Sequence, residues 1–412
     1  MEEGLFVGRH DELAKLAALV AGVSDGVGGV VLIEGEQGIG KTSLLEVGLA
    51  GAAAAGCRVF WAAADELLRQ FPLRLMSECL GGPAAGPSVP TAATFGGDPV
   101  VTAMEEMLAE VDRLCAASPV VLVAEDLQWG DEASVLMWHR LSRAVGQMPL
   151  LLAGSARSGS GRADLEQLRR GLTSRGGVVL TLAALSDADV ADLVGRLLGG
   201  RQGRSLAAVT RRAGGNPLYV RELADGLVRD RSVAADAGEW GLVSGSGVLR
   251  VPTSLAAAIT DRLAGLAAEV LETLRWAAVL GLEFPVADLS VVTGREAGEL
   301  MPVIDSAMMA GVLVDAGPRL GFRHALIRQV LYEGLPAALR AALHLQAAQA
   351  LAAAGAPPER VAGQLVPGPG EQSPLAEAAG PSVAGQHLRA AHQPARAGRI
   401  DHRGRLDQAR DE

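Results

Sequence analysis

The stretch GEQGIGKT at residues 35–42 decides the fold of this 412-residue chain. It follows the pattern Gly-x-x-x-x-Gly-Lys and then Ser or Thr at every required position. An apolar run at 30–33 leads into it, and a helical pattern at about 41–54 follows it. A buried strand that turns through glycines into a helix directs backbone N–H groups and a positive helix end at a phosphate. The stretch therefore predicts a phosphate-binding loop.

The residue types of this loop fit ATP and Mg²⁺ as cofactors. The Lys41 ammonium can reach the β- and γ-phosphates, and the Thr42 hydroxyl can ligate Mg²⁺. The alternative is a glycine-rich turn that contains a lysine by chance. However, the stretch matches the whole pattern between a strand and a helix, and its lysine is one of only two in the chain. We expect nucleotide contacts from these loop residues: Gly35, Gly38, Ile39, Gly40, Lys41, Thr42 and Ser43.

A pair of carboxylates belongs with the loop. The apolar run 120–124 leads into Glu125 and Asp126, so a buried strand delivers both at its carboxyl end, where ligands bind in open α/β sheets. One carboxylate can hold Mg²⁺ and the other can orient the attacking water. We therefore predict Lys41, Glu125 and Asp126 as catalytic residues, and Thr42, Glu125 and Asp126 as metal ligands. A solvated strand end is the alternative.

The first 183 residues predict an α/β fold with a parallel sheet. Short runs rich in Val and Leu recur without polar alternation, as in strands that are covered by helices on both faces. The runs lie at 30–33, 57–61, 120–123, 150–153 and 178–181. Residues 1–183 are thus predicted to form a P-loop NTPase domain.

The strand signal stops near residue 184, and the rest of the chain divides into further segments. Helical patterns, a polar Gly- and Ser-rich stretch, a closing β-hairpin near 312–323 and an Ala/Leu helix follow in order. We expect a helical lid domain at 184–230, a linker at 231–251 and a mostly helical domain at 252–335. The start of a helical arm at 336–365 and an unpacked tail at 366–412 follow.

Composition excludes several classes of protein. Hydrophobic residues make up 49% and charged residues 20%, which is enough apolar surface for a packed core. The net charge of −10 argues against binding nucleic acid through a broad basic face. Cys57, Cys79 and Cys115 form no CxxC pair, and no secretory signal or run of membrane-spanning length is visible. We expect a cytoplasmic protein without a membrane partner.

Four motifs together resemble a known family. FVGR at 6–9, the loop at 35–42, EDLQWGD at 125–131 and GNPLYV at 215–220 occur in the order seen in signal-transduction ATPases with numerous domains. The chain is most similar to the ATPase part of large ATP-binding LuxR-type, MalT-like transcriptional regulators, over roughly residues 5–355. Residues 252–335 resemble the winged-helix domain of these ATPases, which typically holds the closed state.

The resemblance implies roles for four more residues. Arg9 would lie against the nucleotide near its base. Pro217 would pack on the adenine, although a stop and restart of the helix at Asn-Pro is the alternative. Arg157 resembles a sensor of the γ-phosphate, although a surface arginine is the alternative. His324 resembles the histidine of a Met-His-Asp motif that senses the diphosphate, but Ala325 replaces the acid. A structural histidine is therefore the alternative for His324.

The resemblance implies a slow ATPase that serves as a nucleotide-operated switch, with ATP and ADP as alternative ligands. Its inducer would be a protein or a small molecule, and nucleotide-dependent self-association is a further expectation. Glu125 stands where the family usually has Asp, and the chain stops before any sensor region or LuxR-type helix-turn-helix. We therefore expect no sequence-specific DNA binding. A complete DNA-binding activator and a small-molecule P-loop kinase are the alternatives.

Overall fold

The apolar runs of the first 183 residues form one parallel five-stranded sheet in the computed structural model, which describes residues 5–81, 98–159, 161–236, 238–243 and 251–365. The strand order is β2-β3-β4-β1-β5, so the strand before the phosphate-binding loop lies inside the sheet. The strands are β1 (Gly29–Gly35), β2 (Arg58–Ala63), β3 (Val120–Glu125), β4 (Leu150–Arg157) and β5 (Val178–Thr181). The predicted P-loop NTPase fold is thereby confirmed.

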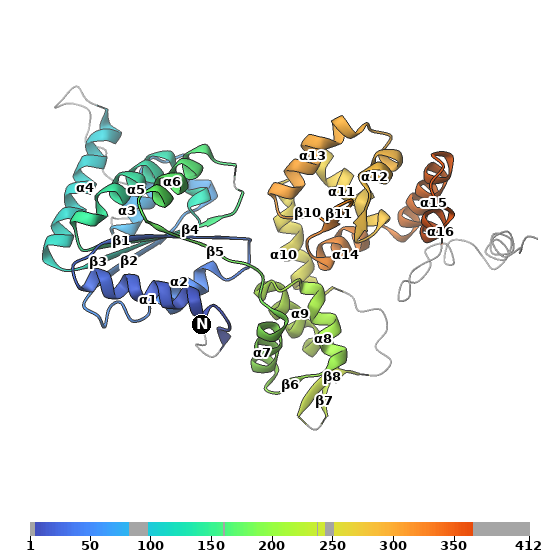
Figure 1. The fold of residues 1–412 in the computed structure, drawn as a ribbon, viewed down its shortest axis with the longest axis horizontal. Coiled ribbons are helices and arrows are strands. Elements are labelled where there is room, and N and C mark those ends of the chain that lie inside the picture. The colour runs from blue at the N-terminus through green and yellow to red at the C-terminus, as the bar shows by residue number, and fades with distance from the viewer. Residues whose placement is uncertain (1–4, 82–97, 160, 237, 244–250, 366–412) are drawn as a thin grey trace, which may run out of the picture. The chain divides into compact units, whose positions relative to one another are not determined.

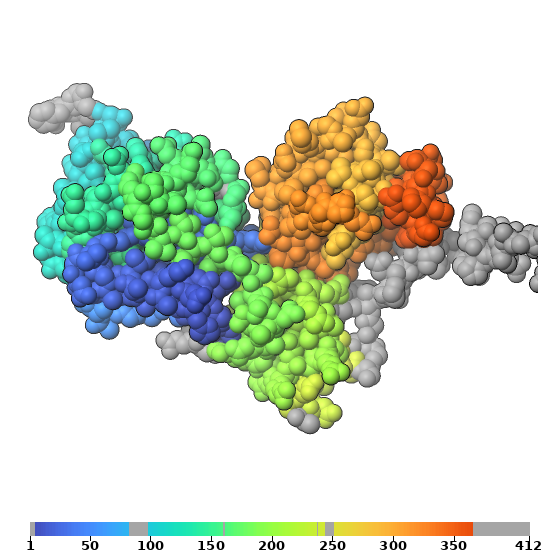
Figure 2. Space-filling model, in the orientation of Figure 1, coloured from blue at the N-terminus to red at the C-terminus, as the bar shows by residue number. Residues whose placement is uncertain are grey.

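Helices cover both faces of this sheet (Figure 1). The α-helices are α1 (His10–Ser24), α2 (Lys41–Leu49), α3 (Arg74–Cys79), α4 (Pro99–Ala117), α5 (Glu132–Ala144) and α6 (Ala163–Ser174), with short 3-10 turns at η2 (Glu66–Leu68), η3 (Leu127–Trp129) and η4 (Val145–Gln147). Alternate residues of β1 enter two cores: Val31 and Ile33 pack with α1 and α2, whereas Val30 and Leu32 pack with α4, α5 and α6. The strands therefore need apolar residues at every position. Figure 2 shows that side chains fill the space which the ribbon leaves open around the sheet.

Residues 184–243 contain a helical group and a small sheet. The helices are α7 (Asp187–Leu198), α8 (Arg204–Thr210), η5 (Arg211–Ala213) and α9 (Pro217–Arg229), and the strands are β6 (Arg201–Gln202), β7 (Val233–Asp236) and β8 (Glu239–Leu242). Ser186 caps α7 through a reciprocal capping box with Asp189. Helix α7 therefore begins with a capped first turn.

The linker that we expected at 231–251 is in part a β-hairpin. Strands β7 and β8 pair antiparallel, and β8 also pairs in parallel with β6. Each strand has only four residues, so the alternation is too short to stand out in the sequence. A Cβ on Gly200 would lie 2.9 Å from the Trp240 ring, so this glycine lets the sheet and α7 approach closely. Residues 244–250 lie outside the described residues.

Residues 251–334 are mostly helical and close with the predicted hairpin. The elements are α10 (Thr253–Ala264), α11 (Ala268–Leu280), β9 (Glu283–Phe284), α12 (Val286–Thr293), α13 (Ala297–Met309), β10 (Leu313–Asp315), β11 (Leu320–Phe322) and α14 (Ala325–Glu333). Strand β9, which the sequence pattern did not indicate, pairs with β11 and gives a three-stranded sheet. The short strand Glu283–Phe284 was missed because two residues carry no alternation.

A second compact unit begins at Leu335. It contains α15 (Ala337–Ala353) and α16 (Pro358–Leu365), which lie in the range expected for a helical arm. The His344 Nδ1 and Gln364 Oε1 atoms are 3.0 Å apart and join these helices. The expected tail at 366–412 lies outside the described residues. Among the helices described, none is both long and apolar enough to cross a bilayer.

Candidate functional site

The loop at 35–42 connects β1 to α2 and depends on two glycines with positive φ. Gly40 precedes α2 at φ 98° and Gly38 has φ 76°, a region that other residues rarely adopt. A Cβ on Gly40 would meet nothing within 4 Å, but a Cβ on Gly38 would lie 2.7 Å from the Leu218 Cβ. Gly40 is therefore required for conformation, whereas Gly38 also lets α9 approach the loop. Gly40, the N-cap residue of α2, provides no side-chain cap for this helix.

Lys41 is buried at the start of α2, with 7% of its surface exposed. Its Nζ donates hydrogen bonds to the backbone oxygens of Gly35, at 3.2 Å, and of Glu36, at 2.9 Å. Burial lowers the pKa of the Lys41 ammonium, with Asp126 opposing this shift and Arg157 adding to it. The ammonium is thus placed beside the loop backbone, within the field of both charged groups.

The predicted metal ligands Thr42 and Glu125 lie in direct contact. The Thr42 hydroxyl donates a hydrogen bond to Glu125 Oε2. The other carboxylate oxygen, Oε1, accepts a hydrogen bond from the indole Nε1 of Trp61 at 2.7 Å. Glu125 is 7% exposed, so these two donors compensate for its burial. The sequence reasoning missed Trp61, which lies at the end of the neighbouring strand β2.

Asp126 lies one residue beyond β3 with φ 51°, a left-handed conformation that aspartate tolerates better than most residues. Its backbone N–H donates to Ser155 Oγ at 3.1 Å, and its Oδ1 accepts from Gln128 Nε2 at 2.8 Å. The Gln128 Oε1 in turn accepts from the backbone N–H of Arg157 at 2.9 Å. Gln128 and Ser155 thus join the ends of β3 and β4, a role that the sequence reasoning did not assign.

Arg157 lies at the carboxyl end of β4, where the sequence places it. Its guanidinium carbon is 5.4 Å from the ring centroid of Trp129, within cation–π range. Trp129, which follows the two carboxylates, thus supports an arginine at the edge of the site. Arg157 and Asp126 both line the cavity described next.

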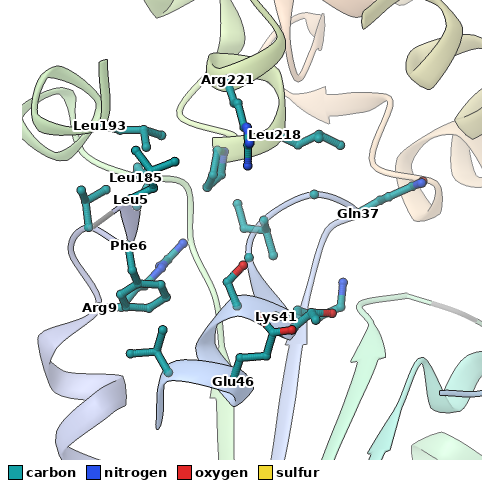
Figure 3. A pocket seen from close by; sticks show the side chains of 18 of the residues that line it. Leu5, Phe6, Arg9, Gln37, Lys41, Glu46, Leu185, Leu193, Leu218 and Arg221 are labelled. Carbon is teal, nitrogen blue, oxygen red and sulfur yellow. The ribbon is translucent and has the colours of Figure 1, made fainter. Parts of the chain in front are cut away.

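A cavity of about 740 Å³ lies beside the loop. Its polar end is lined by Lys41, Thr42, Asp126 and Arg157, and its other walls are mostly apolar. Those walls come from the chain start, from α2 and from residues 185–221: Leu5, Phe6, Val7, Val47, Ala50, Leu185, Leu193, Leu197, Pro217 and Leu218. Figure 3 shows Phe6, Leu185 and Leu193 on one side of this space and the loop with Lys41 on the other.

The two residues predicted to lie near the base, Arg9 and Pro217, both line this cavity. Arg9 has φ 62° and donates a hydrogen bond from its guanidinium to the backbone oxygen of Ala183. Pro217 is the first residue of α9, where its missing N–H costs nothing. Arg221 on α9 and Glu46 on α2 also line the cavity, and the sequence reasoning did not select them.

Asn216, beside the predicted Pro217, ties α9 to the phosphate-binding loop. It is fully buried, and its Nδ2 donates to the backbone oxygen of Gln37 at 3.0 Å. The N–H of Leu218 donates to the backbone oxygen of Gly38 at 3.2 Å. The motif at 215–220 therefore does more than stop a helix, because it forms hydrogen bonds to the loop backbone.

Glu36 occupies one of the positions of the loop pattern at which any residue is allowed. Its carboxylate contacts three basic residues from 251–334. Its carboxylate lies 2.8 Å from Arg323 Nη1, 3.0 Å from His324 Nε2 and 3.6 Å from Arg262 Nη2. Arg262 also donates to the Tyr219 hydroxyl at 3.0 Å. We call Glu36, Tyr219, Arg262, Arg323 and His324 the Glu36 cluster. His324 does not line the cavity, and it contacts the loop through Glu36.

Replacing Glu36 with glutamine is expected to lower the free energy of unfolding by about 2 kcal/mol at neutral pH, because it leaves the buried Arg262 and His324 without their acid. Burial raises the pKa of Glu36, but the hydrogen bond and charge of His324, with Arg323 and Arg262, outweigh it, so the pKa lies below its usual 4.5. The ionised carboxylate therefore stabilises the fold above that pH, and the contribution is lost as pH falls through the lowered value. Urea unfolding at several pH values measures this.

The exposed Glu106 offers a matched control, and Glu106→Gln should change the unfolding free energy by no more than about 0.5 kcal/mol. The difference between wild type and Glu36→Gln should shrink in acid, where both carry a neutral side chain. A difference that persists unchanged well below pH 4 would contradict the charge as its cause.

Comparison with known proteins identifies the first part of the chain. Residues 5–153 match the family model described as an AAA ATPase domain. An uncharacterized protein of Rhizobium meliloti (strain 1021) is 24% identical over an alignment of 389 positions, which covers 83% of this chain and 36% of that protein. The chain thus spans little more than a third of the length of this curated relative.

Solved structures show the same fold. A Walker-type ATPase of Pyrococcus abyssi matches with a TM-score of 0.52 at 13% identity, over 79% of this chain and 96% of that one. The ORC2 protein of Aeropyrum pernix, solved as ADPNP-ADP complexes, matches with a TM-score of 0.51 at 15% identity, over 79% and 94% of the two chains. These likenesses show the fold of the chain, a P-loop NTPase domain followed by a mostly helical region.

Proposed function

We propose that this chain is the ATP-operated switch module of a longer LuxR-type transcriptional regulator, and that it hydrolyses ATP slowly. The proposal rests on which residues line the cavity. The same cavity is lined by Lys41 of the phosphate-binding loop and by Leu193 and Pro217 of the helical group that follows the sheet. A nucleotide held there would touch both parts, so its phosphate content could bias their arrangement.

The residues present fit a nucleoside triphosphate. Lys41 and the N-terminus of α2 provide positive potential for phosphates at one end of the cavity. The apolar side chains of Phe6, Leu193 and Pro217 suit a flat base at the other. The space beside Gly40 is open for a close approach of phosphate oxygens to the backbone.

The residues present also fit a divalent cation. Thr42 and Glu125, already joined by a hydrogen bond, offer the hard oxygen donors that Mg²⁺ prefers beside nucleotide phosphates. When bound, the metal ion would neutralise developing charge on the phosphates. Asp126, held by Gln128, would orient a water molecule and accept its proton. Arg157 would place a cation near the terminal phosphate, which supports its role as a sensor.

The regulatory part of the proposal rests on the order of the four motifs. The Glu36 cluster supports it, because His324 and Arg323 reach the phosphate-binding loop from the region that resembles a winged helix. We propose that this region holds one state of the switch and does not read DNA. An inducer, a protein or a small molecule, would favour the other state, and self-association would follow nucleotide exchange.

Titration calorimetry and a phosphate-release assay on the full chain test the proposal. We expect ATP and ADP to bind in the presence of Mg²⁺, with turnover slower than about 0.1 s⁻¹, below the range of about 1–100 s⁻¹ typical of kinases. Turnover that rises steeply with a small phosphoryl acceptor would instead identify a kinase. A salt-resistant preference for one DNA sequence would identify a complete activator, since non-specific binding is lost as salt rises.

A further inference from the structure

We propose that Trp61 is a positioning residue that orients the Glu125 carboxylate for the metal ion, an inference that rests on the proposed function. Trp61 lies on β2, an edge strand whose Ala63 pairs with Glu125 in the parallel register. Its indole Nε1 is 2.7 Å from Glu125 Oε1. The sheet thus supplies the Glu125 carboxylate with a hydrogen-bond donor, Trp61. This donor belongs to neither the phosphate-binding loop nor the acidic motif.

The two oxygens of Glu125 are held from different sides. Oε2 accepts from Thr42, which lies at the start of α2, and Oε1 accepts from Trp61. An indole N–H can only donate, so Trp61 cannot compete with the carboxylate for a cation. A hydrogen bond to an ionised acceptor is also stronger than one between neutral groups. Trp61 can therefore fix the plane of the carboxylate and leave its remaining lone pairs available.

The exposure of Trp61 argues against a purely structural role. Its side chain is 36% exposed on a strand at the sheet edge, where a tryptophan contributes less to a core than a buried one does. Trp138 provides the contrast, because it is 1% exposed and packs in the core between the sheet and α5. The feature that distinguishes Trp61 is thus its polar atom and the acid that this atom contacts.

The test compares nucleotide affinity with and without Mg²⁺ in Trp61→Phe, which keeps an aromatic ring and removes the N–H. A fluorescent ATP analogue is titrated into the full chain, first in EDTA and then in excess Mg²⁺. We expect the affinity in EDTA to stay within about twofold, and the gain in affinity due to Mg²⁺ to fall about tenfold, as when a partner of a metal ligand is lost. Trp240→Phe, on the small sheet, is the matched control and should match wild type.

The variant Glu125→Gln shows whether Trp61 acts through Glu125. If Trp61 acts through Glu125, adding Trp61→Phe to Glu125→Gln should reduce the Mg²⁺ effect no further. An additional tenfold loss there would overturn the inference, as would a full Mg²⁺ effect in Trp61→Phe alone. Equal losses in EDTA and in Mg²⁺ would also overturn it, because they indicate general damage to the site. Wild type that binds no nucleotide would overturn the proposed function itself.

Discussion

Replacing Lys41 with alanine is expected to weaken ATP binding by at least about a hundredfold, or about 3 kcal/mol. The change removes a buried ammonium that is held beside the loop by the backbone oxygens of Gly35 and Glu36. No other lysine can replace it, since Lys15 is exposed on α1. Calorimetric titration of ATP in Mg²⁺ measures the effect.

The two lysines of the chain provide a matched pair. Lys15→Ala removes the same charge from the surface and should leave ATP affinity within about twofold. Lys41→Met keeps the length of the side chain without its charge and should behave like Lys41→Ala. An unchanged affinity in both Lys41 variants would remove the basis of the proposed function.

Replacing Asp126 with asparagine is expected to lower ATP turnover by at least about a hundredfold, the usual contribution of a group that accepts a proton. Asparagine keeps the volume of the side chain and tolerates the left-handed backbone at this position. ATP affinity should therefore stay within about threefold. A single-turnover phosphate-release assay beside a binding titration separates the two quantities.

Asp112, exposed on α4, serves as the control for this variant, and Asp112→Asn should keep both turnover and affinity. A fall in affinity as large as the fall in turnover would indicate that Asp126 supports the structure of the site. Full turnover in Asp126→Asn would assign the orientation of water to another group.

Most of the fold could be predicted from local sequence. The five strands were predictable because short runs of apolar residues are a property of neighbouring residues, and the same holds for the periodicity of the helices. The hairpin of β7 and β8 was mistaken for a linker, since strands of only four residues each show too little alternation to stand out. Its stability depends on β6 and on the contact of Gly200 with Trp240, and neither can be read from the hairpin alone.

The candidate site could likewise be predicted only in part. Lys41, Thr42, Glu125 and Asp126 were predictable, because each follows a buried strand within a recognisable pattern and parallel strands bring their carboxyl ends to one edge. Arg9, Arg157 and Pro217, which the resemblance assigned to the nucleotide, all line the cavity. His324 was expected against the nucleotide, but its Nε2 contacts Glu36 instead of lining the cavity.

The sequence by itself determined that this chain has a parallel sheet, a phosphate-binding loop and two carboxylates at the end of a strand. These features depend on residue types at fixed short spacings, which sterics and burial link directly to local structure. Only the tertiary structure decided which side chains support them. Trp61 and Glu125 are 64 positions apart, Gln37 and Asn216 are 179 apart, and Glu36 and His324 are 288 apart. Such pairs form when the chain packs, and no short-range pattern encodes them.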